Sequence, residues 1–197
     1  MKLFILCILF VFSSFSFAVP TAKIVKIRGE VSLNGVSLSK GDSISSSGIL
    51  KTKAKSFVKL QIKEWNNSIV LGPNGELNLD LSDNGEKSGK QFNFIKGRVR
   101  WLTSEGKKSS GVIHTRQASI GVRGTDYLLI ANSLLGETEI IVFDGKVQFQ
   151  NSVDIKDSKI ITKHQWGGLG GRYGNQIGEV LDLPINVINA FSKQLNW

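Results

Sequence analysis

The sequence predicts an all-β fold: an antiparallel two-sheet β-roll or sandwich, or a short β-solenoid, with a C-terminal α-helix. Apolar and polar residues alternate along many short stretches, as they do in strands with one buried face and one wet face. Turn signals such as Asn34-Gly35 and Asp144-Gly145 separate these stretches. Only residues 182–195 carry apolar side chains at helical spacing.

The first residues have the features of a secretory signal peptide, which we place at residues 1–18. Lys2 precedes the apolar run Leu3–Phe12, and small residues lead to a cleavage after Ala18. An uncleaved membrane anchor is the alternative, but the run is short for a span of ~20 residues and serines dilute it. We therefore expect an exported chain that is periplasmic or secreted, with no transmembrane span after cleavage.

Candidate strands follow one another along the rest of the chain. Period-two alternation marks residues 58–63, 77–81, 98–101 and 146–149, and each is expected to bury one face. Residues 127–131 and 139–143 are more continuously apolar and fit strands that are covered on both faces.

A glycine followed by an alternating strand recurs at Gly29, Gly97 and Gly145. The spacings of 68 and 48 residues exclude a regular repeat array. Repeated use of one structural unit, a turn followed by a strand, would explain this similarity, and chance combined with hairpin chemistry explains it equally well.

The C-terminal part differs in character, so we divide the chain into a leader (1–18), a β domain (19–165) and a tail (166–197). Residues 166–178 are rich in glycine and are expected to form a loop. A helix should follow, with Pro184 in its first turn. Its apolar face is expected to pack on the β domain and consists of Ile185, Ile188, Phe191 and Leu195.

Catalytic and metal-binding groups are scarce. The single cysteine, Cys7, lies in the predicted leader, which excludes an intrachain disulfide and a cysteine nucleophile or metal site. His114 and His164 are 50 residues apart and lack ligand-like spacing. We expect no enzyme, cofactor or metal. A hydrolase is a remote alternative, which would need one of these histidines beside a carboxylate in a cleft.

The charge balance suggests a binding surface. The chain carries 25 Lys+Arg against 16 Asp+Glu, and the excess is concentrated near residues 87–116. A candidate patch for an anionic glycan, a lipid surface or a protein partner comprises Lys96, Arg98, Arg100, Lys107, Lys108 and, if exposed beside its turn, Trp65. The alternatives are a basic surface without specificity and a Trp65 that packs in the core. Nucleic acid is not expected because the chain is predicted to be exported.

Residues 114–127 predict a sharp corner. Gly121 and Gly124 bracket two residues, and Gly124 can take the positive φ that lets the chain turn into the next strand. The Thr125 hydroxyl can bond to backbone groups there, and Arg123 has enough donors to tie several carbonyls together.

This corner resembles a motif of the FecR domain family, close to Thr-Pro-x-Ala followed by Val-Arg-Gly-Thr-(Glu/Asp)-(Phe/Tyr). The matching positions are Thr115, Ala118, Val122, Arg123, Gly124, Thr125, Asp126 and Tyr127. Weaker matches extend the resemblance over about residues 23–165.

The resemblance implies an all-β domain of the bacterial cell envelope. The best-known members relay the occupancy of an outer-membrane iron transporter to a sigma factor. This sequence differs in having a leader in place of anti-sigma helices and a central membrane span, and Arg116 stands where the family usually has proline. We therefore expect a non-enzymatic, exported sensing module that acts through contact with another envelope protein.

Overall fold

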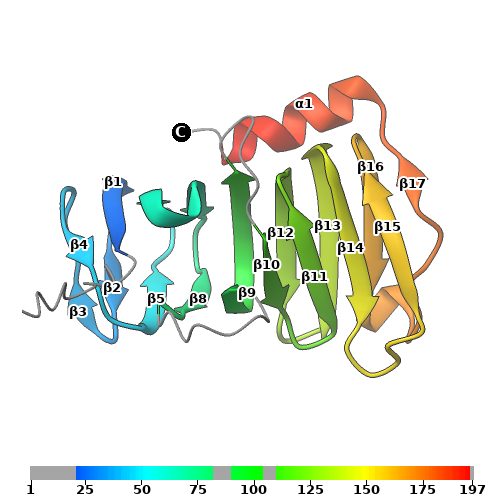
Figure 1. Cartoon of the computed structure of the whole chain (residues 1–197), viewed down its shortest axis with the longest axis horizontal. Helices are drawn as coiled ribbons and strands as arrows, with labels where there is room; N and C mark the ends of the chain where they lie inside the picture. The colour runs from blue at the N-terminus through cyan, green and yellow to red at the C-terminus, as the bar shows by residue number, and fades with distance from the viewer. Residues whose placement is uncertain (1–20, 82–89, 104–109, 196–197) are drawn as a thin grey trace, which may run out of the picture.

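The computed structural model describes residues 21–81, 90–103 and 110–195. The predicted leader lies outside these residues. The described part is mostly β-strand, with two short 3₁₀ helices, η1 (Lys63–Trp65) and η2 (Gly171–Tyr173), and one α-helix, α1 (Ile185–Gln194) (Figure 1). This confirms the predicted all-β fold with a C-terminal helix.

The strands form two sheets, which we name sheet A and sheet B. In spatial order, sheet A contains β4 (Ser43–Ile44), β1 (Ala22–Arg28), β6 (Phe57–Ile62), β7 (Asn67–Leu71), the second half of β9 (Lys90–Thr103), β12 (Asp126–Asn132), β13 (Glu137–Asp144), β16 (Gln165–Leu169) and β17 (Leu181–Asp182). Sheet B contains β3 (Val36–Ser37), β2 (Val31–Leu33), β5 (Gly48–Thr52), β8 (Glu76–Leu79), the first half of β9, β10 (Ser110–His114), β11 (Ala118–Arg123), β14 (Lys146–Asn151) and β15 (Ser158–Thr162). Strand β9 belongs to both sheets and joins them.

One pair of strands departs from the predicted antiparallel pattern, which makes the sheet system mixed. Strands β9 and β10 run parallel, from Gly111 opposite Lys90 to His114 opposite Asn93. The cause is the passage of β9 from sheet B into sheet A. Because the chain leaves β9 in sheet A, β10 enters sheet B in the same direction as the first half of β9.

The chain crosses between the sheets at glycines with positive φ. Gly29 (φ 72°) lies between β1 and β2, Gly97 (φ 102°) bends β9, Gly124 (φ 64°) separates β11 from β12, and Gly145 (φ 81°) separates β13 from β14. Three of these four are the recurring glycines of the sequence, and a buried valine follows each by two positions. The recurring pattern therefore marks sheet-to-sheet corners, which need a residue without a Cβ.

The core lies between the sheets, and α1 covers part of the outer face of sheet A. In β12, Leu129 points into the core while Leu128 belongs to a second apolar cluster with Ile188 of α1. The predicted double coverage of residues 127–131 and 139–143 is thus confirmed. The buried face of α1 omits Ile185, which stays 59% exposed in the first turn, and Pro184 is the N-cap. In Figure 1 the helix runs across β9, β12 and β13.

The predicted glycine-rich loop begins instead with strand β16 (Gln165–Leu169). Its glycines serve close packing: a Cβ on Gly167 would lie 3.0 Å from Cδ1 of Ile161, and one on Gly168 would lie 2.7 Å from the Trp166 ring. Glycines in a strand often mark such close approaches, so the expectation that these glycines form a loop is wrong for residues 166–169. No helix within residues 21–81, 90–103 and 110–195 has the length and apolar character needed to cross a bilayer.

Candidate functional site

The corner motif begins with Thr115, which links the two sheets. Its hydroxyl accepts a hydrogen bond from the Ala118 backbone N–H (3.0 Å) and closes the turn between β10 and β11. The same oxygen lies 2.8 Å from Oγ1 of Thr138, on β13 in sheet A. Thr115 therefore fastens the β10–β11 hairpin of sheet B to the sheet behind it.

The middle of the motif packs one corner against another. Gly124 takes the predicted positive φ, and Thr125 behind it is 3% exposed. The Thr125 Oγ1 has no hydrogen-bond partner in the described part of the chain, which contradicts the predicted bond to the backbone. The reason is packing, since Thr125 Cγ2 lies 2.7 Å from the position of a Cβ on Gly145 and fills the space between the two corners. The backbones of Val122 and Arg123 pair with Gly111 and Ser110, and their side chains lie outside the described part.

The end of the motif has one inward and one outward residue. Tyr127 is fully buried in the core, its hydroxyl has no partner within the described residues, and burial raises the Tyr127 pKa well above its ordinary value. Asp126 points outward and accepts two hydrogen bonds from Arg100, Nε to Oδ1 at 2.9 Å and Nη2 to Oδ2 at 2.7 Å.

Arg100 connects this corner to α1. Its Nη1 donates to the backbone oxygen of Ser192 on the helix (2.9 Å), and the guanidinium lies 4.7 Å from the ring centroid of Phe143. The bidentate pair with Asp126 is only 16% and 15% exposed. Such a fork geometry is a strong, directional interaction, so the motif's acidic residue holds the arginine that anchors the helix.

Of the described cations of the predicted basic patch, Lys96 and Arg98 line one groove, whereas Arg100 lies apart from them beneath α1. Lys96 pairs with Glu76 on sheet B, Arg98 is exposed on sheet A, and Arg100 is occupied beneath α1. The bend at Gly97 lies between the first two, and both side chains line the groove that also contains Leu134. Lys107 and Lys108 lie outside the described residues.

Trp65 is not available for stacking on a sugar. It is 5% exposed and packs edge-to-face on Phe92 at a centroid distance of 5.4 Å. The exposed Trp65 considered from the sequence is therefore wrong, because the turn residue Asn66 takes a left-handed conformation that leaves the preceding indole in the core.

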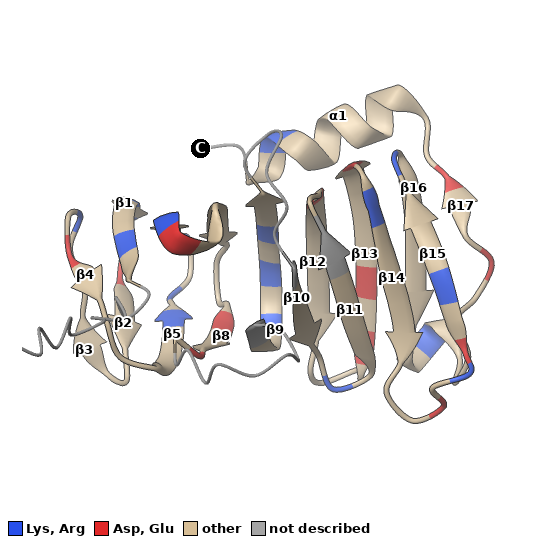
Figure 2. Cartoon of the chain, in the orientation of Figure 1, with Lys and Arg blue, Asp and Glu red and all other residues tan. Residues whose placement is uncertain are grey.

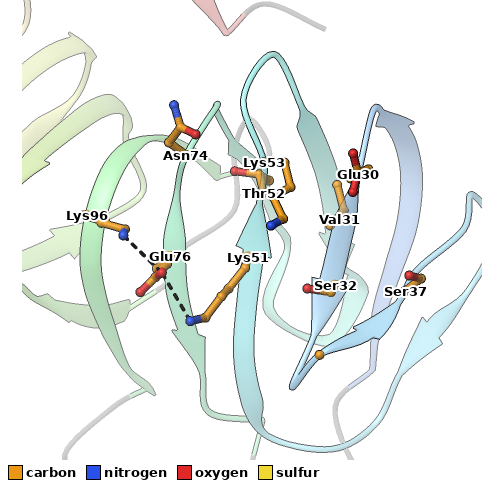
Figure 3. Close-up of a pocket in the computed structure, with 11 residues that line it drawn as sticks. Glu30, Val31, Ser32, Ser37, Lys51, Thr52, Lys53, Asn74, Glu76 and Lys96 are labelled. Carbon is orange, nitrogen blue, oxygen red and sulfur yellow. Dashed lines mark ion pairs between the residues drawn. The ribbon is translucent and has the colours of Figure 1, made fainter.

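A pocket of about 580 Å³ lies on sheet B (Figure 3). Figure 3 shows Glu76 between two ammonium groups, at 3.3 Å from Lys51 Nζ and 3.2 Å from Lys96 Nζ. Burial alone would raise the pKa of Glu76, but the hydrogen bonds and charges of the two lysines hold it below its ordinary value. A carboxylate with a lowered pKa is a poor general acid at neutral pH, so this group is better suited to ordering the pocket than to proton transfer.

The structure contains a second basic surface, which was not predicted from the sequence. We name it the β1–β6 basic face, and it consists of Lys23, Lys26, Arg28 and Lys59 on the outer side of sheet A. Lys26 lies opposite Lys59, whose pKa is lowered by burial and then by the charges of Lys26 and Arg100. Figure 2 shows the basic residues of β1 and β9. The cations of β1 can be read in the sequence, but a bulge between Ile24 and Lys26 breaks the alternation that would assign them to one face.

A hollow of about 360 Å³ opens in this face, lined by Lys26, Lys59, Gln61 and Ser68 among others. The Ser68 Oγ has no hydrogen-bond partner within the described residues. Two ammonium groups and an amide can bind carboxylate or phosphate oxygens.

The two histidines are apart from these surfaces. His114 Nδ1 lies 3.0 Å from Oγ of Ser119, and His164 occupies the turn before β16 with φ 66°. In the described part of the chain no group of three or more His, Cys, Asp or Glu is placed to hold a metal ion.

Comparison with known proteins identifies the family. The family model described as "FecR protein" matches residues 49–148, half of the chain. The chain belongs to the FecR family. No curated protein matched in a separate search.

Solved structures share the fold of this FecR-family chain. Two crystal structures from Parabacteroides distasonis, each described as a "putative anti-sigma factor", superpose with TM-scores of 0.60 and 0.58 at 10% and 12% identity. The superpositions cover 74% and 73% of this chain but only 64% and 63% of those proteins, so each includes a further part that this chain does not match. The FecR match itself includes the Gly97 and Gly124 corners and the Arg100–Asp126 pair.

Proposed function

We propose that this chain is an exported, non-enzymatic FecR sensing module of the cell envelope that acts through protein–protein contact. The observation that carries the proposal is the FecR family match over residues 49–148. The structural likeness to proteins described as anti-sigma factors supports the same role, in signal relay.

The use of polar groups in the described residues supports a binding role over a catalytic one. The polar side chains of the corner motif are engaged in the fold: Thr115 joins the sheets and Asp126 holds Arg100. The carboxylate of the sheet B pocket is neutralised by two lysines. An active site would instead need a nucleophile or base left poised toward a substrate.

The β1–β6 basic face is our candidate surface for the protein partner. Its cations lie side by side on the outer face of sheet A, and an acidic protein surface would be complementary to them. Arg100 lies two strands from Lys59 in sheet A, because Lys59 is opposite Val70 and Val70 is opposite Arg100. Binding there is thus close to the residue that anchors α1.

In-cell photo-crosslinking tests the proposal. A photo-reactive residue in place of Gln61, which is exposed within the basic face, should capture one envelope protein. The same residue in place of Lys146, exposed on β14, is the matched control and should not. Charge reversal by Lys26→Glu with Lys59→Glu should abolish the Gln61 product. Equal capture from both positions, or capture that survives charge reversal, would refute this surface, and a chain found only in the cytoplasm would refute export.

The hollow beside Lys26 and Lys59 favours a second candidate function, the binding of an anionic envelope glycan. Lys26, Lys59 and the Gln61 amide line the hollow and offer charge and a hydrogen-bond donor to a sugar carboxylate. Affinity electrophoresis in gels containing polygalacturonate should show retardation that salt weakens and Lys59→Glu removes. Migration that is independent of the polymer would exclude this function.

A further inference from the structure

Four aliphatic side chains stand exposed on two loops. In the β12–β13 loop Leu134 is 96% exposed and Leu135 58%, and in the β14–β15 loop Val153 is 92% exposed and Ile155 72%. We call these four residues the aliphatic tips. Exposed apolar side chains add nothing to the core, and when several gather at one place they often mark a surface that contacts another phase or molecule.

Topology places both loops at the same end of the sandwich. Strand β13 ends and β14 begins at the Gly145 corner, so the loop before β13 and the loop after β14 both lie at the opposite end. Contacts around Gln117 agree. Its backbone oxygen accepts a hydrogen bond from Ser152, and its side-chain Nε2 lies 3.0 Å from the position of a Cβ on Gly136.

Three basic side chains are exposed at the same end of the sandwich as the tips. Arg98, Arg116 and Lys156 are exposed at this end, with Asp154 as the exposed acid of the two loops. Arg98 comes here because Gly97 lies opposite Ala131, near the end of β12. A groove of about 540 Å³ runs between Arg98 and Leu134 and is also lined by Lys96, Asn74 and Asn132.

We propose that the aliphatic tips and their basic rim are a docking surface for an anionic phospholipid bilayer. The tips enter the boundary between head groups and acyl chains, and Arg98, Arg116 and Lys156 meet the lipid phosphates, with the groove beside Leu134 holding one head group. Buried apolar area together with attraction to anionic lipids is the combination that binds peripheral proteins to membranes.

The shape and composition of the surface favour a bilayer over a protein partner. Protein interfaces are anchored by aromatic residues and arginine in closely packed pockets, whereas here the apolar residues are all aliphatic and stand at the tips of loops. A bilayer offers no fixed pockets and needs none. This inference adds a membrane contact to the proposed sensing role, and it stands whether or not a protein binds the β1–β6 basic face.

A fluorescent probe at one tip tests the proposal in the full chain. An environment-sensitive fluorophore is attached through Val153→Cys, with Cys7→Ser to leave one reactive thiol. Vesicles of phosphatidylcholine with 30% phosphatidylglycerol should raise its emission, and lipids carrying a quencher in the acyl chain should quench it. The control is the probe at Val36→Cys, a 69% exposed position on β3, at the edge of sheet B farthest from β15. The emission of that probe should keep its value in water when vesicles are added.

Two double variants separate the apolar contribution to vesicle binding from the electrostatic contribution. Leu134→Ser with Ile155→Ser should weaken vesicle binding measured by the Val153 probe by about tenfold while leaving the melting temperature unchanged, since both side chains are exposed. Arg98→Glu with Arg116→Glu should abolish the preference for anionic vesicles, and Lys40→Glu with Lys146→Glu, an equal change of charge at two other exposed positions, should not. A Val153 probe that stays in water, or that responds equally without phosphatidylglycerol, overturns the proposal. Protection of the probe by an envelope protein but not by vesicles would assign the surface to a protein and also overturn it.

Discussion

The bend of β9 at Gly97 is open to a direct test by Gly97→Ala. At φ 102° an alanine is strained, because L residues are disfavoured at positive φ. In addition, the new Cβ would lie 2.7 Å from Cα and 3.3 Å from N of Gly75. Those atoms are backbone and cannot rotate away, so one strand of the corner must move.

The two penalties give the expected magnitude. Left-handed backbone costs a non-glycine residue roughly 1–2 kcal/mol. An added carbon in a closely packed site costs about 1–3 kcal/mol. We expect a total loss of about 3 kcal/mol of unfolding free energy, which for a domain of this size lowers the melting temperature by about 6–12 °C. Thermal unfolding followed by circular dichroism measures this loss.

Two other glycines separate strain from steric clash. Gly35 has φ 83° but open space around its Cβ position, so Gly35→Ala should lose only about 1–2 kcal/mol. Gly121 has no positive φ, and its nearest neighbour would be Gln148 Cβ at 3.7 Å, so Gly121→Ala should be close to neutral. If the melting temperature of Gly97→Ala is no lower than that of Gly35→Ala, the close approach of β9 to Gly75 is wrong. If it equals that of Gly121→Ala, the positive φ at Gly97 is wrong as well.

Three further outcomes are expected. Arg100→Met should loosen α1, because it removes the bond to Ser192 and leaves a partly buried carboxylate unpaired; hydrogen exchange of residues 185–194 should rise, and unchanged exchange would refute the anchoring role. Tyr127→Phe should leave stability equal or slightly higher, because it deletes a buried hydroxyl without a partner, and a loss above about 1 kcal/mol would mean that the hydroxyl is bonded. Glu76→Gln should lose less than about 1 kcal/mol of unfolding free energy near pH 6, since its lysines are half exposed. The folded pKa of Glu76 lies below 4.5, so its contribution is present above that pH and is lost as the pH falls through the folded value; urea unfolding of both proteins from pH 6 to 3 should converge, and a constant difference would contradict the assignment.

The spacing of apolar residues predicted most strands and the helix, because an element that buries one face has apolar residues at the period of that element. The strands around Val58, Leu77 and Val147 and the helix around Ile188 are where alternation and helical spacing place them. The glycine-rich strand β16 was missed, because glycines mark turns and close approaches alike, and only the neighbouring Ile161 side chain distinguishes the two.

The relative positions of residues on distant strands were less predictable, and they determine which cations of the candidate patch lie together. Consecutive cations from Lys96 to Arg100 look like one surface only if the strand stays in one sheet. Lys96 pairs with Glu76 and also lines the groove that Arg98 and Leu134 line, while Arg100 lies under a helix that begins 85 residues later. The β1–β6 basic face and the aliphatic tips arise in the same way, from residues that only the pairing of distant strands brings together.

The Arg100–Asp126 pair gives the acidic position of the FecR motif a physical meaning. Asp126 lies beside Arg100 because β12 pairs with β9, with Leu102 opposite Asp126 and Arg100 opposite Leu128. The corner at Gly124 sets the start of β12 and thus the register that brings the carboxylate to the guanidinium. The guanidinium in turn donates to the Ser192 carbonyl of α1, and it lies two strands from Lys59, because Lys59 is opposite Val70 and Val70 is opposite Arg100. An acidic partner bound to that face would change the electrostatic field at Arg100 as well as at the lysines. The Gly124 corner, the Arg100 anchor of α1 and the β1–β6 basic face are therefore linked through neighbouring strands of sheet A.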